Sequence, residues 1–189
     1  METLDTTHRS AQQNNLLQRL LSRYELADGT IIGTGFVRPE DEERLVRGFN
    51  KLSLQSKMFR FHCGKNKLST YEKEYLVNID NYDHLAIGAV DLVKSYDVGI
   101  ALIRYIRDKT DPSKAEVALT VIDEYQHKGI GTLLYNEMLE YARKNKIKLI
   151  VNCVMKENTT MLNILEKFGG EMKDNSGNQY LIEVKLPEH

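Results

Sequence analysis

A turn with two glycines between a strand and a helix is the most constraining feature of this sequence. Residues 121–132 read V-I-D-E-Y-Q-H-K-G-I-G-T, after a β-branched apolar run and before the helical run L-L-Y-N-E-M-L-E-Y-A-R-K. The first N–H groups of such a helix have no partners within it, and the helix dipole adds positive potential there. Glycines permit positive φ and close approach of a ligand to the backbone. The turn therefore predicts a site for an anion such as a phosphate.

The glycine spacing excludes two common phosphate loops. The P-loop pattern GxxxxGK[ST] is absent, and Leu134 stands where a dinucleotide fingerprint needs its third glycine. What remains is Q-x-x-G-x-G, formed by Gln126, Gly129 and Gly131. A plain structural glycine turn is the alternative interpretation.

Hydrophobic periodicity predicts a mixed α/β fold. Strands are expected at residues 30–38, 84–93, 98–107, 115–122, 148–155 and 178–186, and helices at 40–52, 54–61, 69–80, 132–146 and 159–169. Ser53, and either Ser69 or Thr70, are expected to cap helices. An antiparallel meander comes first, and the later strand–helix–strand crossover implies a parallel or splayed pair in a mostly antiparallel sheet flanked by helices.

The chain divides into a short extension and one domain. Residues 1–29 are a polar lead-in around a short amphipathic helix, with leucines at positions 16, 17, 20 and 21, and residues 30–189 form the domain. The leucines are expected either to pack on their own domain or to form a contact in a homodimer.

Composition and charge exclude several classes of function. The 26 basic and 27 acidic residues give a formal net charge of −1, which disfavours broad binding to nucleic acid or membranes. No apolar run approaches the roughly 20 residues that span a bilayer. Cys63 and Cys153 lack metal-ligand spacing, so no metal site is expected. We expect a cytoplasmic protein with reduced thiols.

Two long segments resemble the Gcn5-related N-acetyltransferase (GNAT) superfamily. They are A-L-T-V-I-D-E-Y-Q-H-K-G-I-G-T-L-L-Y-N-E-M-L-E-Y-A-R and V-M-K-E-N-T-T-M-L-N-I-L-E-K-F-G. The resemblance implies a GNAT-like sheet that binds acetyl-CoA as co-substrate, with the pyrophosphate at the glycine turn and the pantetheine arm along residues 119–121. The implied cofactor-binding residues are Leu119, Thr120, Val121, Gln126, His127, Lys128, Gly129, Ile130, Gly131, Thr132 and Asn158.

Further segments between Phe36 and Gly169 narrow the resemblance. Four segments are similar, in the same order, to the acetyltransferase domain of bacterial Pat-type protein lysine acetyltransferases. They are F-V-R-P-E-D-E-E-R-L, L-S-L-Q-S-K-M-F-R-F, I-D-N-Y-D-H-L-A-I-G-A-V and A-E-V-A-L-T-V. The resemblance implies a protein lysine as acceptor. Such proteins often carry a separate sensor domain. We expect no room for one in this sequence beyond its short N-terminal stretch, so the resemblance does not imply regulation by a small ligand.

Glu116 is the candidate general base. A free lysine amine has a pKa of about 10.4, so acetyl transfer at neutral pH requires removal of a proton. Glu116 lies about 17 Å along an extended strand from Val121, far from the phosphate end. It also matches the base of Pat-type enzymes that this sequence resembles. The alternative is an exposed glutamate paired with a lysine.

Other parts of the reaction are less defined by sequence. The backbone N–H near Val121 is the expected oxyanion donor. Leu165 stands where many GNAT enzymes, which this sequence resembles, have a tyrosine that acts as general acid. An acidic pocket of Asp80, Asp83 and Glu116 would suit a cationic acceptor, whereas Arg60 reads as a structural cation. Two alternatives stay open: acetylation of a small amine, such as a polyamine or amino sugar, and a module that senses acyl-CoA without catalysis.

Overall fold

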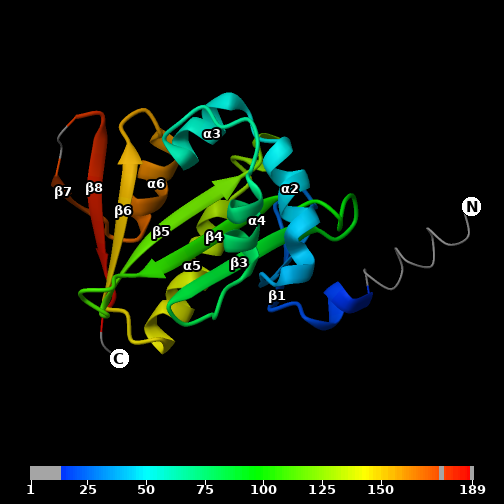
Figure 1. Ribbon diagram of the computed structural model, residues 1–189, viewed down its shortest axis with the longest axis horizontal. Coiled ribbons are helices and arrows are strands. Elements are labelled where there is room, and N and C mark those ends of the chain that lie inside the picture. The colour runs from blue at the N-terminus through cyan, green and yellow to red at the C-terminus, as the bar shows by residue number, and fades with distance from the viewer. Residues whose placement is uncertain (1–13, 175–176, 188–189) are drawn as a thin grey trace, which may run out of the picture.

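The computed structural model describes residues 14–174 and 177–187. Within them, eight strands form one sheet in the order β1-β2-β3-β4-β5-β6-β8-β7 (Figure 1). The strands are β1 (Ser22–Glu25), β2 (Ile31–Phe36), β3 (His84–Asp91), β4 (Ala101–Arg107), β5 (Lys114–Val121), β6 (Leu149–Met155), β7 (Glu171–Asp174) and β8 (Gln179–Lys185). The helices are η1 (Pro39–Asp41), α2 (Glu42–Asn50), α3 (Leu54–Phe61), α4 (Thr70–Val77), η2 (Asp123–Tyr125), α5 (Ile130–Lys144) and α6 (Thr159–Lys167).

The sheet is antiparallel throughout except between β5 and β6. These two strands pair only from Lys114 to Glu116, whereas β5 stays paired with β4 as far as Val121. The parallel strands therefore separate after Glu116 and leave a gap beside the second half of β5. The expected mixed sheet with one splayed parallel pair is confirmed.

Side-chain alternation along β4 distributes residues between the two faces of the sheet. Ile103 and Tyr105 are fully buried on the face covered by α5, where the Asn145 amide at the end of α5 donates to the Tyr105 hydroxyl at 2.5 Å. Leu102 and Arg104 point to the opposite face, which α2, α3 and α4 cover (Figure 1). The two faces thus hold different layers, and Arg104 belongs to the side opposite α5.

Helix starts follow the serine caps expected from the sequence. The Ser53 side chain accepts the Ser56 N–H at the start of α3, and Ser69 accepts the Glu72 N–H at the start of α4. At α4 the Glu72 carboxylate also accepts the Ser69 N–H, which completes a capping box. Ser69, rather than Thr70, is therefore the cap of α4.

The N-terminal segment differs from the expected amphipathic helix. The described helix covers only residues 14–18, and the chain then forms β1, which pairs with β2. Leu16 is buried at 7% exposure, while Leu17 is 46% exposed, so the four leucines do not share one helical face. Residues 1–13 of the expected extension lie outside the described residues. The domain boundary at residue 30 and a dimer contact stay predictions.

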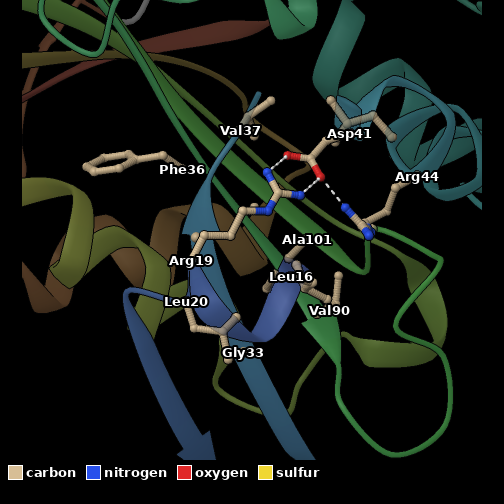
Figure 2. Close-up of a pocket in the computed structure, with 15 residues that line it drawn as sticks. Leu16, Arg19, Leu20, Gly33, Phe36, Val37, Asp41, Arg44, Val90 and Ala101 are labelled. Atoms are coloured by element: carbon tan, nitrogen blue, oxygen red, sulfur yellow. Dashed lines mark hydrogen bonds and ion pairs between the residues drawn. The ribbon is translucent and has the colours of Figure 1, made fainter. Parts of the chain in front are cut away.

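A buried ion pair fixes this segment to the domain. Arg19 donates to both carboxylate oxygens of Asp41, at 3.0 and 2.5 Å, and Arg44 binds the same carboxylate (Figure 2). The Arg19 and Asp41 side chains are only 10% and 9% exposed. The bidentate geometry joins the residues before β1 to the start of α2.

The sheet ends in a strand that the sequence pattern did not indicate, β7. This strand forms an antiparallel hairpin with β8. No helix in the described ranges, 14–174 and 177–187, has both the length and the hydropathy of a membrane-spanning segment.

Candidate functional site

The glycine turn leaves the start of α5 open to a ligand. Gly129 occupies the N-cap position with φ of 85°, His127 also has a positive φ of 60°, and no side chain of the described residues caps the helix. The N–H groups of residues 130–132 are therefore available to an external acceptor. The expected backbone geometry of an anion site is present, and Thr132 does not cap the helix.

Gly131 has a second role that the sequence did not predict. It is buried, and a Cβ at this position would lie 2.9 Å from Ile164 Cδ1 and 3.3 Å from Leu119 Cδ2. The absence of a side chain lets α5 pack closely against α6 and β5. Gly129 is different, because a Cβ there would meet nothing within 4 Å and only its positive φ favours glycine.

The Gln126 side chain connects the glycine turn to the end of β5 and to α3. Its side-chain amide donates to the Val121 carbonyl at 3.0 Å and to the Ser56 hydroxyl at 3.1 Å. Asp123 in turn accepts the Ser53 N–H at 2.9 Å and the Ser56 hydroxyl at 3.0 Å. This exposed carboxylate thus binds the start of α3, at the end of β5.

Lys128 is already paired. Its ammonium lies 2.9 Å from the Asp28 carboxylate and 5.2 Å from the centre of the Tyr125 ring. The hydrogen bond from Lys128 holds the pKa of Asp28 well below its usual value. His127 is exposed, so of the two expected side-chain donors only Lys128 must break a contact to reach a phosphate.

Asn158 caps α6, because its side-chain oxygen accepts the Met161 N–H at 3.1 Å. On β5, peptide groups alternate in direction, and the Ile122 N–H bonds back toward β4 at 2.9 Å. The peptide groups of Leu119 and Val121 therefore face the gap beside β6. The cofactor-binding roles of Leu119, Val121 and Asn158 stay predictions.

Glu116 stands where β5 and β6 part. It is the last residue of β5 in register with β6, opposite Val151, and its side chain is exposed. It lines a cavity of about 320 Å³ bounded by α3, α4, β4 and β5. The lining residues include Arg60, Phe61, Leu68, Glu72, Tyr75, Leu76, Arg104, Ile106 and Val117.

Arg104 shares this cavity, and sequence reasoning missed it. Its register partner on β5 is Ala118, so it lies on the same face as Glu116. It is 2% exposed, and it contacts His84 Nε2 at 3.1 Å and the Leu76 carbonyl at 3.2 Å. Burial lowers the pKa of Arg104 to about 9, with a further contribution from the charge of Arg60. An arginine between apolar residues in the run A-L-I-R-Y-I was the available signal.

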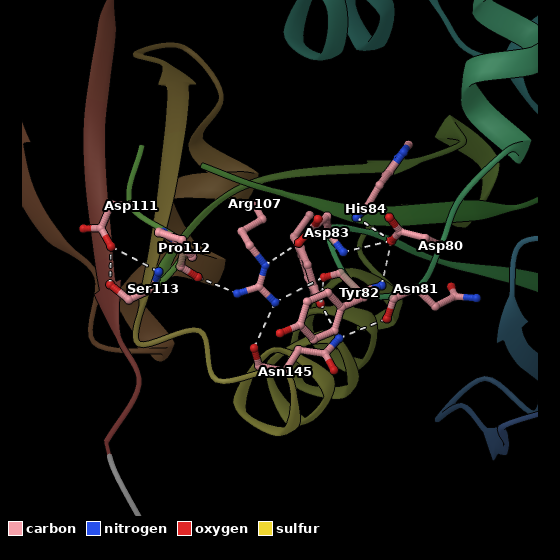
Figure 3. Close-up of polar contacts among 11 residues, drawn as sticks. Asp80, Asn81, Tyr82, Asp83, His84, Arg107, Asp111, Pro112, Ser113 and Asn145 are labelled. Atoms are coloured by element: carbon pink, nitrogen blue, oxygen red, sulfur yellow. Dashed lines mark hydrogen bonds and ion pairs between the residues drawn. The ribbon is translucent and has the colours of Figure 1, made fainter. Parts of the chain in front are cut away.

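The expected acidic pocket is not formed. One Asp80 oxygen accepts the backbone N–H groups of residues 82, 83 and 84 at 2.8 to 2.9 Å, and Asp83 pairs with Arg107 at 2.8 Å (Figure 3). Arg107 also donates to the Asn145 carbonyl at 2.9 Å. Neither aspartate lines the cavity of Glu116, because the Asp80 carboxylate binds backbone of the turn before β3 and Asp83, in the same turn, pairs with Arg107. The cavity instead presents Arg60 and Arg104.

Leu165 is 1% exposed in the main core, so the position of the usual tyrosine offers no side-chain acid. Cys63 and Cys153 are both free thiols. Burial raises the pKa of the Cys153 thiol, and the charge of Glu116 adds to this effect.

A known acetyltransferase is similar to this chain in sequence. The chain is 29% identical over 155 residues to acetyltransferase Pat of Mycolicibacterium smegmatis, covering 80% of this chain and 44% of that protein. The chain thus spans less than half the length of that relative.

Solved structures agree in fold. The GNAT domain of S. lividans PAT superposes with a TM-score of 0.80 at 24% identity, over 87% of this chain and 96% of that one. YncA of Salmonella typhimurium, solved with acetyl-CoA, has a TM-score of 0.67 at 12% identity, over 84% and 95% of the two chains. The model of the acetyltransferase (GNAT) family matches residues 47–170. With its splayed β5–β6 pair and open glycine turn, the chain belongs to the acetyltransferase (GNAT) family.

Proposed function

We propose that this protein transfers the acetyl group of acetyl-CoA to the side-chain amine of a lysine in a protein. The observation that carries the proposal is the arrangement of β5. The uncapped start of α5 lies at one end of this strand, and Glu116 lies about 17 Å away, where β6 diverges. The gap between them exposes backbone that can hold an extended pantetheine arm.

The cofactor contacts follow from this arrangement. Amides of residues 129–132 would bind the pyrophosphate, with His127 and Lys128 as side-chain donors. Peptide groups of Leu119 and Val121 would bond the pantetheine arm in the manner of an added strand. Gln126 would act by bracing the turn, and Asn158 by fixing the start of α6.

Glu116 supplies the base in this proposal. It accepts a proton from the lysine ammonium, directly or through water, and the neutral amine then attacks the thioester carbon. A β5 backbone N–H nearer to Glu116 stabilises the oxyanion as the tetrahedral intermediate forms, because the donor expected at Val121 lies about 17 Å from the base. The C–S bond then breaks, the nitrogen gives its second proton to water, and water protonates the CoA thiolate because Leu165 offers no acid.

The acceptor class rests on the Pat-like sequence, and the open cavity beside Glu116 admits a long side chain. The buried Leu165 favours a second candidate, an acyl-CoA-sensing module without catalysis. A cytoplasmic location stays a prediction.

A thiol-release assay separates these functions. Wild-type protein and Glu116→Gln are mixed with acetyl-CoA and lysine peptides, spermidine or glucosamine, with Glu124→Gln as an exposed control outside the cavity. Turnover of lysine peptides that falls about 10²–10⁴-fold in Glu116→Gln alone supports the proposal. A hit restricted to one small amine favours the small-molecule enzyme. Binding of acetyl-CoA without turnover favours the sensor.

A further inference from the structure

The cavity beside Glu116 contains two arginines, of which Arg104 has no carboxylate partner within the described residues and Arg60 has only the longer-range attraction of Glu116. Arg104 is 2% exposed, and the hydrogen-bond partners of its guanidinium among the described residues are the imidazole Nε2 of His84 and the Leu76 carbonyl. Its Nε atom is buried without a hydrogen-bond partner in residues 14–174 and 177–187. Arg60 stacks on the Phe61 ring, with its Cζ 5.0 Å from the ring centre.

The acidic side chains of the cavity compensate for these charges only in part. Glu72 is committed to Lys65 at 2.5 Å and to the backbone and hydroxyl of Ser69. Glu116 attracts Arg60 and counteracts the lowering of the Arg60 pKa by burial, but within the described part of the chain it forms no ion pair within 4.0 Å with either arginine. One carboxylate facing two guanidinium groups leaves Arg104 buried without a counter-charge, which is costly, so the cavity suits an anion that comes from outside.

We propose that Arg60 and Arg104 form a binding site for a carboxylate of the acceptor, next to the amine that Glu116 deprotonates. A guanidinium fork matches a carboxylate in geometry and binds it through charge-assisted hydrogen bonds. Glu116 faces the same cavity and would repel a phosphate dianion more strongly than a carboxylate.

The register of the strands places this site close to the chemistry. Arg104 and Ile106 on β4 pair with Ala118 and Glu116 on β5, so the cation and the base lie two residues apart along one face. Exposed Tyr75, from α4, lines the same cavity. The acceptor is thus an amine with a nearby carboxylate, either an acidic residue beside a target lysine or the α-carboxylate of a free amino acid.

Matched acceptors test the proposal, which in this part rests on the proposed acetyl transfer. The pairs are acetyl-Glu-Lys-amide against acetyl-Gln-Lys-amide, and free lysine against lysinamide. Wild-type kcat/KM should be about tenfold higher for the carboxylate member of one pair, and which pair responds identifies the source of the carboxylate.

The arginine variants show whether the preference comes from this site. In Arg60→Gln the ratio within the responding pair should fall to about one, whereas Arg23→Gln, an exposed arginine on β1, should keep it. If Arg60 only balances the charge of Glu116, Arg60→Gln will lower kcat/KM equally for all acceptors, which overturns the proposal.

A binding measurement separates this proposal from the proposed function. Succinate and succinamide are titrated calorimetrically into protein saturated with CoA, so that the glycine turn is filled. Succinate should bind at least about tenfold more tightly than succinamide, and Arg60→Gln or Arg104→Lys should abolish the difference. This result would support the carboxylate site even if no acceptor were acetylated. Equal binding of the two probes, or an unchanged difference in a folded Arg60→Gln protein, would overturn it.

Discussion

Gly131 is expected to allow close packing of the start of α5 against one methyl group of α6, the Cδ1 of Ile164. An alanine Cβ there would lie 2.9 Å from Ile164 Cδ1, 3.3 Å from Leu119 Cδ2 and 3.9 Å from a Val121 methyl. Overpacking of this kind costs about 1–3 kcal/mol, and the better helix propensity of alanine offsets roughly 0.5–1 kcal/mol. We expect Gly131→Ala to lower the free energy of unfolding by about 1–2 kcal/mol.

A double-mutant cycle isolates the contact. Ile164→Val removes the Cδ1 atom and alone costs about 0.5–1.5 kcal/mol. In the double variant the alanine methyl enters the vacated space. The loss of unfolding free energy in the double variant should therefore be about 1 kcal/mol smaller than the sum of the two single losses. Urea denaturation followed by circular dichroism measures all four proteins. Additivity within about 0.3 kcal/mol would refute the packing role of Gly131.

The remaining predictions concern one buried ion pair, one base and one histidine. Asp41→Asn should lower the free energy of unfolding by about 3 kcal/mol in urea denaturation, because the buried Arg19 then keeps only the half-exposed Glu40, at 3.5 Å, as a counter-charge within the described residues; a loss below about 1 kcal/mol would contradict this. Glu116→Gln should lower kcat/KM without weakening binding of acetyl-CoA in calorimetry, and a parallel loss of binding would argue against a role confined to the base. Burial, and then the charge of Arg104, lower the pKa of His84 to about 4, below its usual value of 6.5. The unfolded chain therefore binds an extra proton between these values, so the contribution of His84 to stability is full above about pH 6.5 and falls as pH drops toward 4. Between pH 7 and 5, wild type should lose roughly 1 kcal/mol more stability than His84→Gln, a figure reduced because the ring is partly exposed; equal losses would exclude this assignment.

Much of the fold could be predicted because its elements have strong local signals. The strands β2 to β6 are apolar and β-branched, and serine caps mark α3 and α4. The exceptions are β1 and β7, which have four residues each and show no apolar alternation. β1 exists because the Leu21 N–H and the following residues pair with β2, a tertiary contact that overrides the helical spacing of the leucines.

The candidate site divides in the same way. The glycine turn and Glu116 lie within one continuous segment, so residue spacing alone indicated their separation along β5. The arginine pair depends on packing of α3 against β5 and on the register of β4, which no local pattern specifies. For the same reason, the Lys128–Asp28 ion pair and the use of Asp80 and Asp83 in a turn could not be foreseen.

Calorimetric titration of acetyl-CoA tests the central claim, that backbone amides at the start of α5 hold the pyrophosphate. The comparison is between wild type, Gly129→Val and Gly177→Val, since both glycines have positive φ but only Gly129 lies in the turn. We predict one-to-one binding by wild type with a Kd between about 1 μM and 1 mM, unchanged in Gly177→Val and at least about tenfold weaker in Gly129→Val. An absence of heat with folded wild type, or equal affinity in Gly129→Val, would contradict the account.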